Sequence, residues 1–162
     1  MRAEEIMNTD VIRVSPETLV KEAADIMAEK DISGAPVVDE NGRLVGILSE
    51  SDLIQARRIP AWLSYWVNMD DLGPAGGALA AQTDDFLETL KEHLKRPVSE
   101  VMTRKVWTVS PQAPVEDVVK LMTSRRINRV PVVEDGRLLG IITRGDVLEA
   151  MRGWGTAPYE TE

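Results

Sequence analysis

Apolar residues recur at the spacing of one helical face in two separate stretches of the chain. The spacing i, i+3, i+4, i+7 is the signature of an amphipathic helix with one buried stripe. The positions that follow it are Val20, Ala23, Ala24, Met27, Val115, Val118, Val119 and Met122. We therefore predict helices from about Leu19 to Lys30 and from about Pro114 to Arg126, with these residues in the core.

Shorter apolar runs rich in β-branched residues surround each predicted helix and predict strands. A short strand is expected before each helix, and a pair of strands after it. These runs are Val11–Val14, Ala35–Val38, Leu44–Leu48, Val106–Val109, Val130–Val133 and Leu138–Ile142. Asn41-Gly42 and Asp135-Gly136 fall between the paired strands, where such dipeptides favour a tight hairpin. Ser49-x-x-Asp52 and Thr143-x-x-Asp146 then each open a second helix.

The two stretches are copies of one β-α-β-β-α unit. Equivalent residues lie 95 positions apart up to the hairpin turn and 94 apart after it, because DENGR in copy one is answered by EDGR in copy two. One such unit buries too little apolar surface to be comfortably stable alone. The predicted fold class is α/β (α+β), with the two repeats packed on each other through their sheets.

The duplication sets the expected domain limits. Copy one spans 1–54, an insertion spans 55–97, copy two spans 98–152, and a tail at 153–162 lacks periodicity. The insertion carries Trp62, Tyr65 and Trp66, which could be core or an oligomer contact, and a predicted helix in its last part. His93 lies on that helix among Lys and Glu, so we expect its side chain to be solvated.

Composition excludes several classes of function. The 162 residues include no cysteine and one histidine, so thiolate metal sites, cysteine nucleophiles and His pairs are absent. Neither a signal-peptide core nor an apolar run long enough to span a membrane is found, and we expect a cytoplasmic protein. No nucleophile–base set can be assembled, so we do not expect an enzyme.

The two copies differ in net charge. The chain has a net charge of -8, which argues against binding nucleic acid. Residues 1–54 carry 5 basic and 12 acidic groups, a net of -7, whereas residues 98–152 carry 9 and 7, a net of +2. At aligned positions, Thr9, Asp10, Asp31, Gly34 and Glu50 are replaced by Arg104, Lys105, Arg126, Arg129 and Arg144.

The ordered set of motifs resembles a tandem pair of CBS domains, a Bateman module. It consists of MTRKVWTVSP, the h-x-x-x-h-P-V-V-[DE] segments at Ile32–Asp39 and Ile127–Glu134, G-R-L-x-G, and [ST]-x-x-D, and the whole ordered set occurs twice. The resemblance implies two repeats around a pseudo-twofold axis. It also implies clefts for adenosine-containing ligands such as AMP, ADP, ATP or S-adenosylmethionine, and association into a homodimer through helices.

The resemblance also implies which residues line each cleft. In copy two they are Asp146, Thr143, Arg144, Lys105, Val106, Arg129, Val130 and Pro131. A weaker site in copy one would use Asp52, Ser49, Asp10, Val11, Gly34, Ala35 and Pro36. The two aspartates would accept hydrogen bonds from ribose hydroxyls. The same aspartates also fit an acidic capping box, so a cap and a ligand contact are both open for each.

The basic substitutions in copy two favour a polyanionic ligand there. We expect an adenine nucleotide as a regulatory ligand, with no required cofactor and no metal site. The alternative is a CBS assembly module that binds proteins and keeps its clefts empty. A regulated partner protein is implied by either reading, and the sequence does not identify it.

Overall fold

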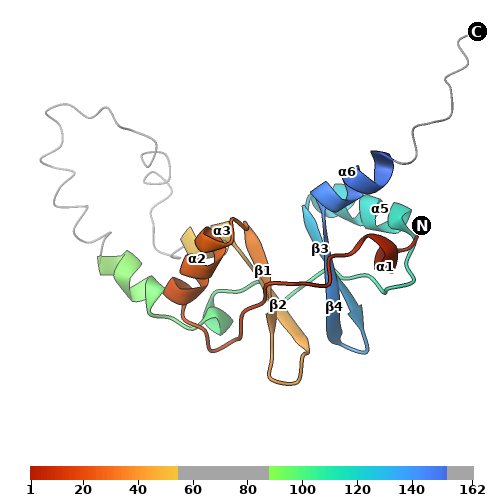
Figure 1. Cartoon of the computed structure of the whole chain (residues 1–162). Coiled ribbons are helices and arrows are strands. Elements are labelled where there is room, and N and C mark those ends of the chain that lie inside the picture. Colours follow the sequence, from red (N-terminus) through yellow and green to blue (C-terminus); the bar gives the residue numbers. More distant parts are fainter. Residues whose placement is uncertain (55–87, 153–162) are drawn as a thin grey trace, which may run out of the picture. The chain divides into compact units, whose positions relative to one another are not determined.

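The computed structural model describes residues 1–54 and 88–152. In chain order its elements are α1 (Ala3–Ile6), α2 (Val20–Glu29), β1 (Gly34–Val38), β2 (Leu44–Ser49), α3 (Glu50–Ile54), a helical stretch at 88–94, the 3-10 turn η1 (Val98–Glu100), α5 (Val115–Arg125), β3 (Arg129–Glu134), β4 (Arg137–Thr143) and α6 (Arg144–Arg152). Figure 1 shows them in sequence colours. The aromatic residues Trp62, Tyr65 and Trp66, for which core and oligomer contact were both open, lie outside the described residues, as does the tail.

The predicted helices and hairpins form in both copies. β1 pairs with β2, and β3 pairs with β4 in antiparallel register. Asp135 and Gly136 both adopt positive φ, 51° and 79°, as a two-residue hairpin turn requires. In copy one the extra residue gives a longer loop, in which the Asp39 carboxylate accepts hydrogen bonds from the backbone of Asn41 and Arg43, both at 2.9 Å.

The short strands predicted before each helix shrink to single bridges. Val14 bridges Val37 and Val109 bridges Val132, both in parallel orientation, and the remaining residues of 11–14 and 106–109 are not in strands. In each run only the residue next to the serine-proline pair hydrogen-bonds to the hairpin. A third strand of full length therefore does not develop beside either hairpin.

The chain forms two compact units that do not follow the order of the repeats. Unit 1 consists of 1–13, 38–46 and 104–162, and unit 2 of 14–37 and 47–103. Unit 1 is therefore built largely from copy two, with the first segment of copy one and the tip of the first hairpin added to it. The domain limits given above follow the order of the repeats along the sequence, and they stay a prediction.

Backbone hydrogen bonds show that the two repeats exchange their leading segments. In unit 1, the backbone nitrogens of Ala3 and Glu4 donate to the carbonyls of Ala113 and Pro111 at 2.8 and 2.9 Å. In unit 2, the equivalent bonds run from Val98 to Thr18 and from Ser99 to Pro16, at 2.7 and 2.9 Å. Asn8 with Ile141, and Thr103 with Ile47, repeat the pattern with two bonds each. Each helix–hairpin body is therefore completed by the other repeat's first segment.

Each unit has its own apolar core. In unit 1, the buried cluster comes from α1, α5, β3, β4 and α6, namely Ala3, Val118, Met122, Val130, Val132, Ile142 and Val147. In unit 2, the fully buried side chains include Val20, Val37, Leu48 and Val98. The predicted helix stripes thus face inward, with Ala24 and Val119 half-buried at their edges.

Candidate functional site

The start of α6 is held by a reciprocal capping box. The backbone nitrogen and the hydroxyl of Thr143 both donate to Oδ2 of Asp146, at 2.7 Å each. In return the backbone nitrogen of Asp146 donates to Oγ1 of Thr143 at 3.4 Å. The predicted cap is confirmed. Oδ1 of Asp146 makes no hydrogen bond within the described part of the chain, so one carboxylate oxygen keeps its full acceptor capacity.

The hairpin register places Arg129 beside this cap. Arg129 pairs directly with Thr143 across β3 and β4, and Nη1 of its guanidinium is buried. The backbone nitrogen of Arg144 donates to the Asn128 carbonyl at 3.0 Å, which fixes the first turn of α6 against the start of β3. Three of the predicted residues, Arg129, Thr143 and Asp146, are thus brought to one end of the hairpin.

The other residues predicted for this site have varied surroundings. Val130 and Pro131 are buried in β3, and Val106 is half-buried. Lys105 is exposed, and its Nζ lies 5.2 Å from the ring centroid of Trp107. The guanidinium of Arg125 stacks on the same ring, with Cζ at 3.9 Å from the centroid. Sequence reasoning missed Trp107; the signal was an aromatic residue where copy one has Ile12.

The corresponding cap in copy one is also formed. The backbone nitrogen and hydroxyl of Ser49 donate to Oδ2 of Asp52 at 2.9 Å, which confirms the cap of α3. Gly34, Ala35 and Pro36 lie on β1 in unit 2, whereas exposed Asp10 and half-buried Val11 belong to unit 1. Within unit 2, the ligand residues expected for copy one carry no arginine equivalent to Arg129.

His93 is buried, and the expectation of a solvated side chain was wrong. Only 3% of its surface is exposed, and Nε2 lies 3.2 Å from the backbone carbonyl oxygen of Asp52, within hydrogen-bond distance. Its helical face is covered because the stretch 88–94 packs near α3, a contact that spans 41 residues of chain. The charged neighbours Lys91 and Glu92 point outward and gave no sign of this.

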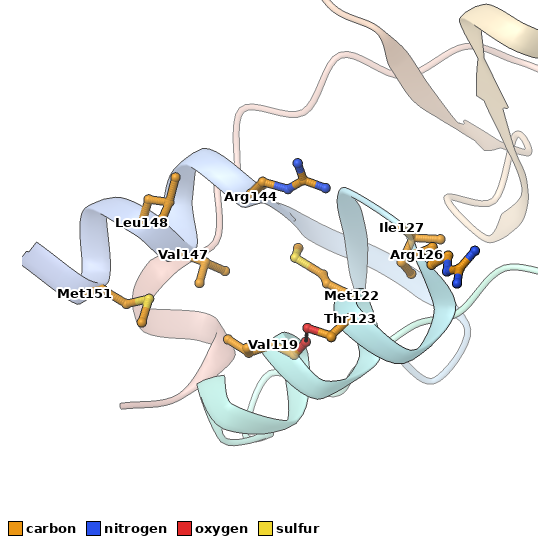
Figure 2. A pocket seen from close by; sticks show the side chains of 9 residues that line it. All are labelled: Val119, Met122, Thr123, Arg126, Ile127, Arg144, Val147, Leu148 and Met151. Atoms are coloured by element: carbon orange, nitrogen blue, oxygen red, sulfur yellow. Dashed lines mark hydrogen bonds between the residues drawn. The ribbon is translucent and has the colours of Figure 1, made fainter.

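A groove of about 480 Å³ lies between α5 and α6 in unit 1. It is lined mainly by apolar side chains, with arginines at two positions: Val119, Met122, Thr123, Arg126, Ile127, Arg144, Val147, Leu148 and Met151. Figure 2 shows Met122 and Val147 between the two helices and Arg126 at the end of the groove away from Met151. The side chain of Arg144, a predicted ligand residue, therefore contributes to this groove.

The described residues form neither a metal-binding cluster nor a membrane-spanning helix. Among residues 1–54 and 88–152, no group of three or more His, Cys, Asp or Glu side chains is arranged to hold a metal ion. No helix in these ranges is long and apolar enough to cross a membrane.

The family model for the CBS domain matches residues 3–59 and 98–153, which together are more than half of the chain. A tandem arrangement of two such domains is also what the duplicated motifs and the paired helix–hairpin bodies define. The chain therefore belongs to the CBS domain family, as its motifs predicted, and its α+β fold agrees with that family's solved structures.

Relatives and solved structures match most of the chain. An uncharacterized protein of Methanocaldococcus jannaschii, MJ1426, is 37% identical over 157 residues, which cover 93% of this chain and 91% of the relative. The chloroplastic protein CBSX2 of Arabidopsis thaliana is 31% identical, but the chain spans only 57% of its length.

Two solved structures contain adenosine compounds. CBSX2 in complex with AMP is 26% identical with a TM-score of 0.67, over 94% of this chain and 97% of that chain. The CBS pair of protein MJ0100, in complex with 5′-methylthioadenosine and S-adenosyl-L-methionine, is 28% identical with a TM-score of 0.66, over 95% and 98%. CBS pairs similar to this chain thus bind adenosine-type ligands.

Proposed function

We propose that the protein is a regulatory module that senses an adenine nucleotide, AMP, ADP or ATP, at the copy-two site and signals to a partner protein. The observation that carries the proposal is the placement of Arg129, Thr143 and Asp146 at one end of the β3–β4 hairpin. Oδ1 of Asp146 accepts from the ribose hydroxyls, because Oδ2 is already engaged by the helix cap.

Charge supports a phosphorylated ligand over a cationic one. Arginine forks bind phosphate oxygens through paired, charge-assisted hydrogen bonds. Copy two presents Arg129 on β3 and Arg144 at the start of α6, where copy one has Gly34 and Glu50. We therefore assign nucleotide binding to copy two and only weak binding to copy one, and we rank S-adenosylmethionine below the nucleotides.

Calorimetric titration with AMP, ADP, ATP and S-adenosylmethionine tests this proposal. A ligand at 100 times its dissociation constant raises the free energy of unfolding by about 2.7 kcal/mol, so a thermal-shift assay gives an independent measurement. We expect heat and a raised melting temperature with at least one nucleotide. The absence of both heat and a thermal shift with all three nucleotides would contradict nucleotide sensing.

The second candidate is a protein-interaction module without a small ligand, and the apolar groove between α5 and α6 favours it. Leu148 and Met151 in that groove are 59% and 44% exposed. Analysis of small molecules released from the purified, denatured protein separates the two candidates. Recovery of an adenine nucleotide supports sensing, whereas protein free of nucleotide that also fails the titration supports the interaction module.

The proposal includes a homodimer and no enzymatic activity. Exposed apolar side chains on paired helices are typical of an interface, and a specific one buries on the order of 1,200 Å² or more. Light scattering at micromolar concentration should give twice the chain mass of 18.0 kDa. A cytoplasmic location is part of the same proposal, because that compartment holds adenine nucleotides.

A further inference from the structure

We propose that Trp107 is a positioning residue that holds two cations, Lys105 and Arg125, next to the copy-two site, and that these cations make the site select ATP over AMP. The inference rests on nucleotide binding in the proposed function. It adds the class of nucleotide that is preferred and the residues that choose it. All three side chains belong to unit 1.

Trp107 contacts a cation from each of two different segments. Cζ of the Arg125 guanidinium lies 3.9 Å from the centroid of the indole ring, and Nζ of Lys105 lies 5.2 Å from it. Both distances are within the range of about 6 Å over which an aromatic ring attracts a cation, and indole attracts cations most strongly. Trp107 is half-buried, whereas Lys105 and Arg125 are exposed. The ring therefore holds the two side chains in place and leaves their charges open to a ligand.

Neither cation has an acidic partner in the described part of the chain. Within residues 1–54 and 88–152, the side chains of Lys105 and Arg125 contact the ring and make no hydrogen bond or ion pair. Stacking uses the flat face of a guanidinium and leaves the N–H groups at its edge free to donate. The lysine ammonium group also keeps donors that the ring does not use. Two like charges near one ring repel each other, and an anion bound to both relieves that repulsion.

The backbone brings this cluster to the end of the hairpin that carries the candidate site. Val109 bridges Val132 in parallel orientation. The preceding residues, 105–107, therefore approach the end where β3 begins, and α5 ends four residues before Arg129. Arg129 pairs with Thr143 at this same end. The two cations on the ring thus add to the phosphate-binding charge proposed for Arg129.

Copy one lacks this arrangement. The residues at the positions equivalent to Trp107, Lys105 and Arg125 are Ile12, Asp10 and Lys30. An aliphatic side chain has no aromatic face to attract a cation, and an aspartate repels phosphate. The cluster is therefore a feature of the stronger of the two proposed sites.

The number of phosphate groups decides how much of this charge a ligand uses. AMP carries a single phosphate, which Arg129 and Arg144 already serve in the proposed site. ATP carries additional phosphates, which bring more negative charge and more acceptor oxygens to the same end of the hairpin. We expect the wild type to bind ATP at least about tenfold more tightly than AMP, because hydrogen bonds between charged groups are the strong ones.

Calorimetric titration of AMP and ATP in metal-free buffer is the test, because the phosphates then keep their full charge. The wild type is compared with Trp107→Ile, Trp107→Phe and Lys105→Gln. Trp107→Ile introduces the residue that copy one has at this position. It should weaken ATP binding about tenfold and change AMP binding by less than about threefold, and Lys105→Gln should give the same difference. Trp107→Phe keeps a ring that attracts cations and should retain most of the preference for ATP.

Lys120→Gln is the matched control for loss of a lysine charge. Lys120 is an exposed residue of α5 whose Nζ lies 3.3 Å from a carboxylate oxygen of Asp117, and its substitution should leave both affinities unchanged. Urea denaturation checks the fold of each variant. Because Lys105 is exposed, Lys105→Gln keeps the comparison valid where a Trp107 variant fails to fold. Raised salt should weaken ATP binding more than AMP binding in the wild type, since added phosphate charges are screened.

The outcomes separate the inference from the proposal on which it rests. A wild-type chain that binds neither nucleotide contradicts nucleotide sensing and the inference together. Equal affinity of the wild type for AMP and ATP overturns the inference alone, as does a full preference for ATP in Trp107→Ile and Lys105→Gln. Equal losses of AMP and ATP binding in these variants would show that Trp107 acts on the fold of the site and not on the phosphates, which also overturns the inference and leaves nucleotide sensing intact.

Discussion

Thr143 and Asp146 hold each other through a capping box in which the side chain of each accepts a hydrogen bond from the backbone of the other, at 2.7 and 3.4 Å. The side chain proposed to bind ribose is therefore also the one that starts α6. Loss of ligand binding after a substitution at Asp146 has two possible origins, lost contact or lost helix, and they must be measured separately.

Asp146→Ala should lower nucleotide affinity by about ten- to a hundredfold, because hydrogen bonds to a charged group contribute roughly 1.5–3 kcal/mol. Loss of the cap should lower the free energy of unfolding by about 1 kcal/mol. Calorimetry measures the first effect and urea denaturation the second. Asp52→Ala is the matched control, since it removes the equivalent cap in copy one. Asp52→Ala should lower the free energy of unfolding by a similar amount and change the nucleotide affinity little. Abolished binding in Asp52→Ala together with normal binding in Asp146→Ala would place the main site in copy one.

Arg129→Gln should weaken binding of AMP, ADP or ATP by roughly tenfold or more, since it removes a charge-assisted contact to phosphate at similar length. Adenosine, which lacks phosphate, should bind the variant and the wild type alike. Arg137→Gln is the control, because Arg137 is an exposed arginine at the other end of the same hairpin. Equal losses for adenosine and for the nucleotides would show that Arg129 acts on the fold of the site and not on phosphate.

His93→Ala should lower the free energy of unfolding by about 2–3 kcal/mol, because it leaves a cavity and removes a partner of the Asp52 carbonyl. Glu92→Ala, one position away and exposed, should change stability by no more than about 0.5 kcal/mol. Chemical denaturation of both variants gives the comparison. Equal, small effects at the two positions would mean that His93 is solvated, as its charged neighbours suggested.

The local elements were predictable because their determinants are local. Asp135-Gly136 specifies a turn with two positive φ angles, and the spacing of Val115, Val118 and Met122 specifies a helical face. Burial of His93 was not predictable, since the Asp52 carbonyl that its Nε2 contacts lies 41 positions away. The candidate site also has some features that neighbouring residues determine and others that distant residues determine. The cap at Thr143 follows from four adjacent residues, whereas the stacking of Arg125 on Trp107 depends on how α5 ends beside another segment.

Exchange of the leading segments was missed for a related reason. AEEIM at the start of copy one and VSEVM at the start of copy two have the same pattern of apolar and polar positions, so neither sequence indicates which helix–hairpin body it packs on. The hydrogen bonds assign each to the other repeat. The choice rests on long-range contacts, which periodicity does not report.

The exchange predicts which fragment of the chain folds. A fragment 1–54 contains the whole of copy one but lacks 98–103, whose backbone bonds with Thr18, Pro16 and Ile47 complete unit 2. It also lacks Val98, which is fully buried.

A fragment 14–103 contains every segment of unit 2 and the hairpin tip that links them. We expect the longer fragment to show a cooperative urea transition and dispersed amide resonances, and 1–54 to show neither, because removing a hydrogen-bonded segment and a buried side chain leaves unsatisfied backbone groups at an open core. A fragment 1–97 is the control for chain length, because it is longer than 14–103 but still lacks 98–103. If 1–97 or 1–54 unfolds as cooperatively as 14–103, the exchanged segment contributes little and each repeat is complete by itself.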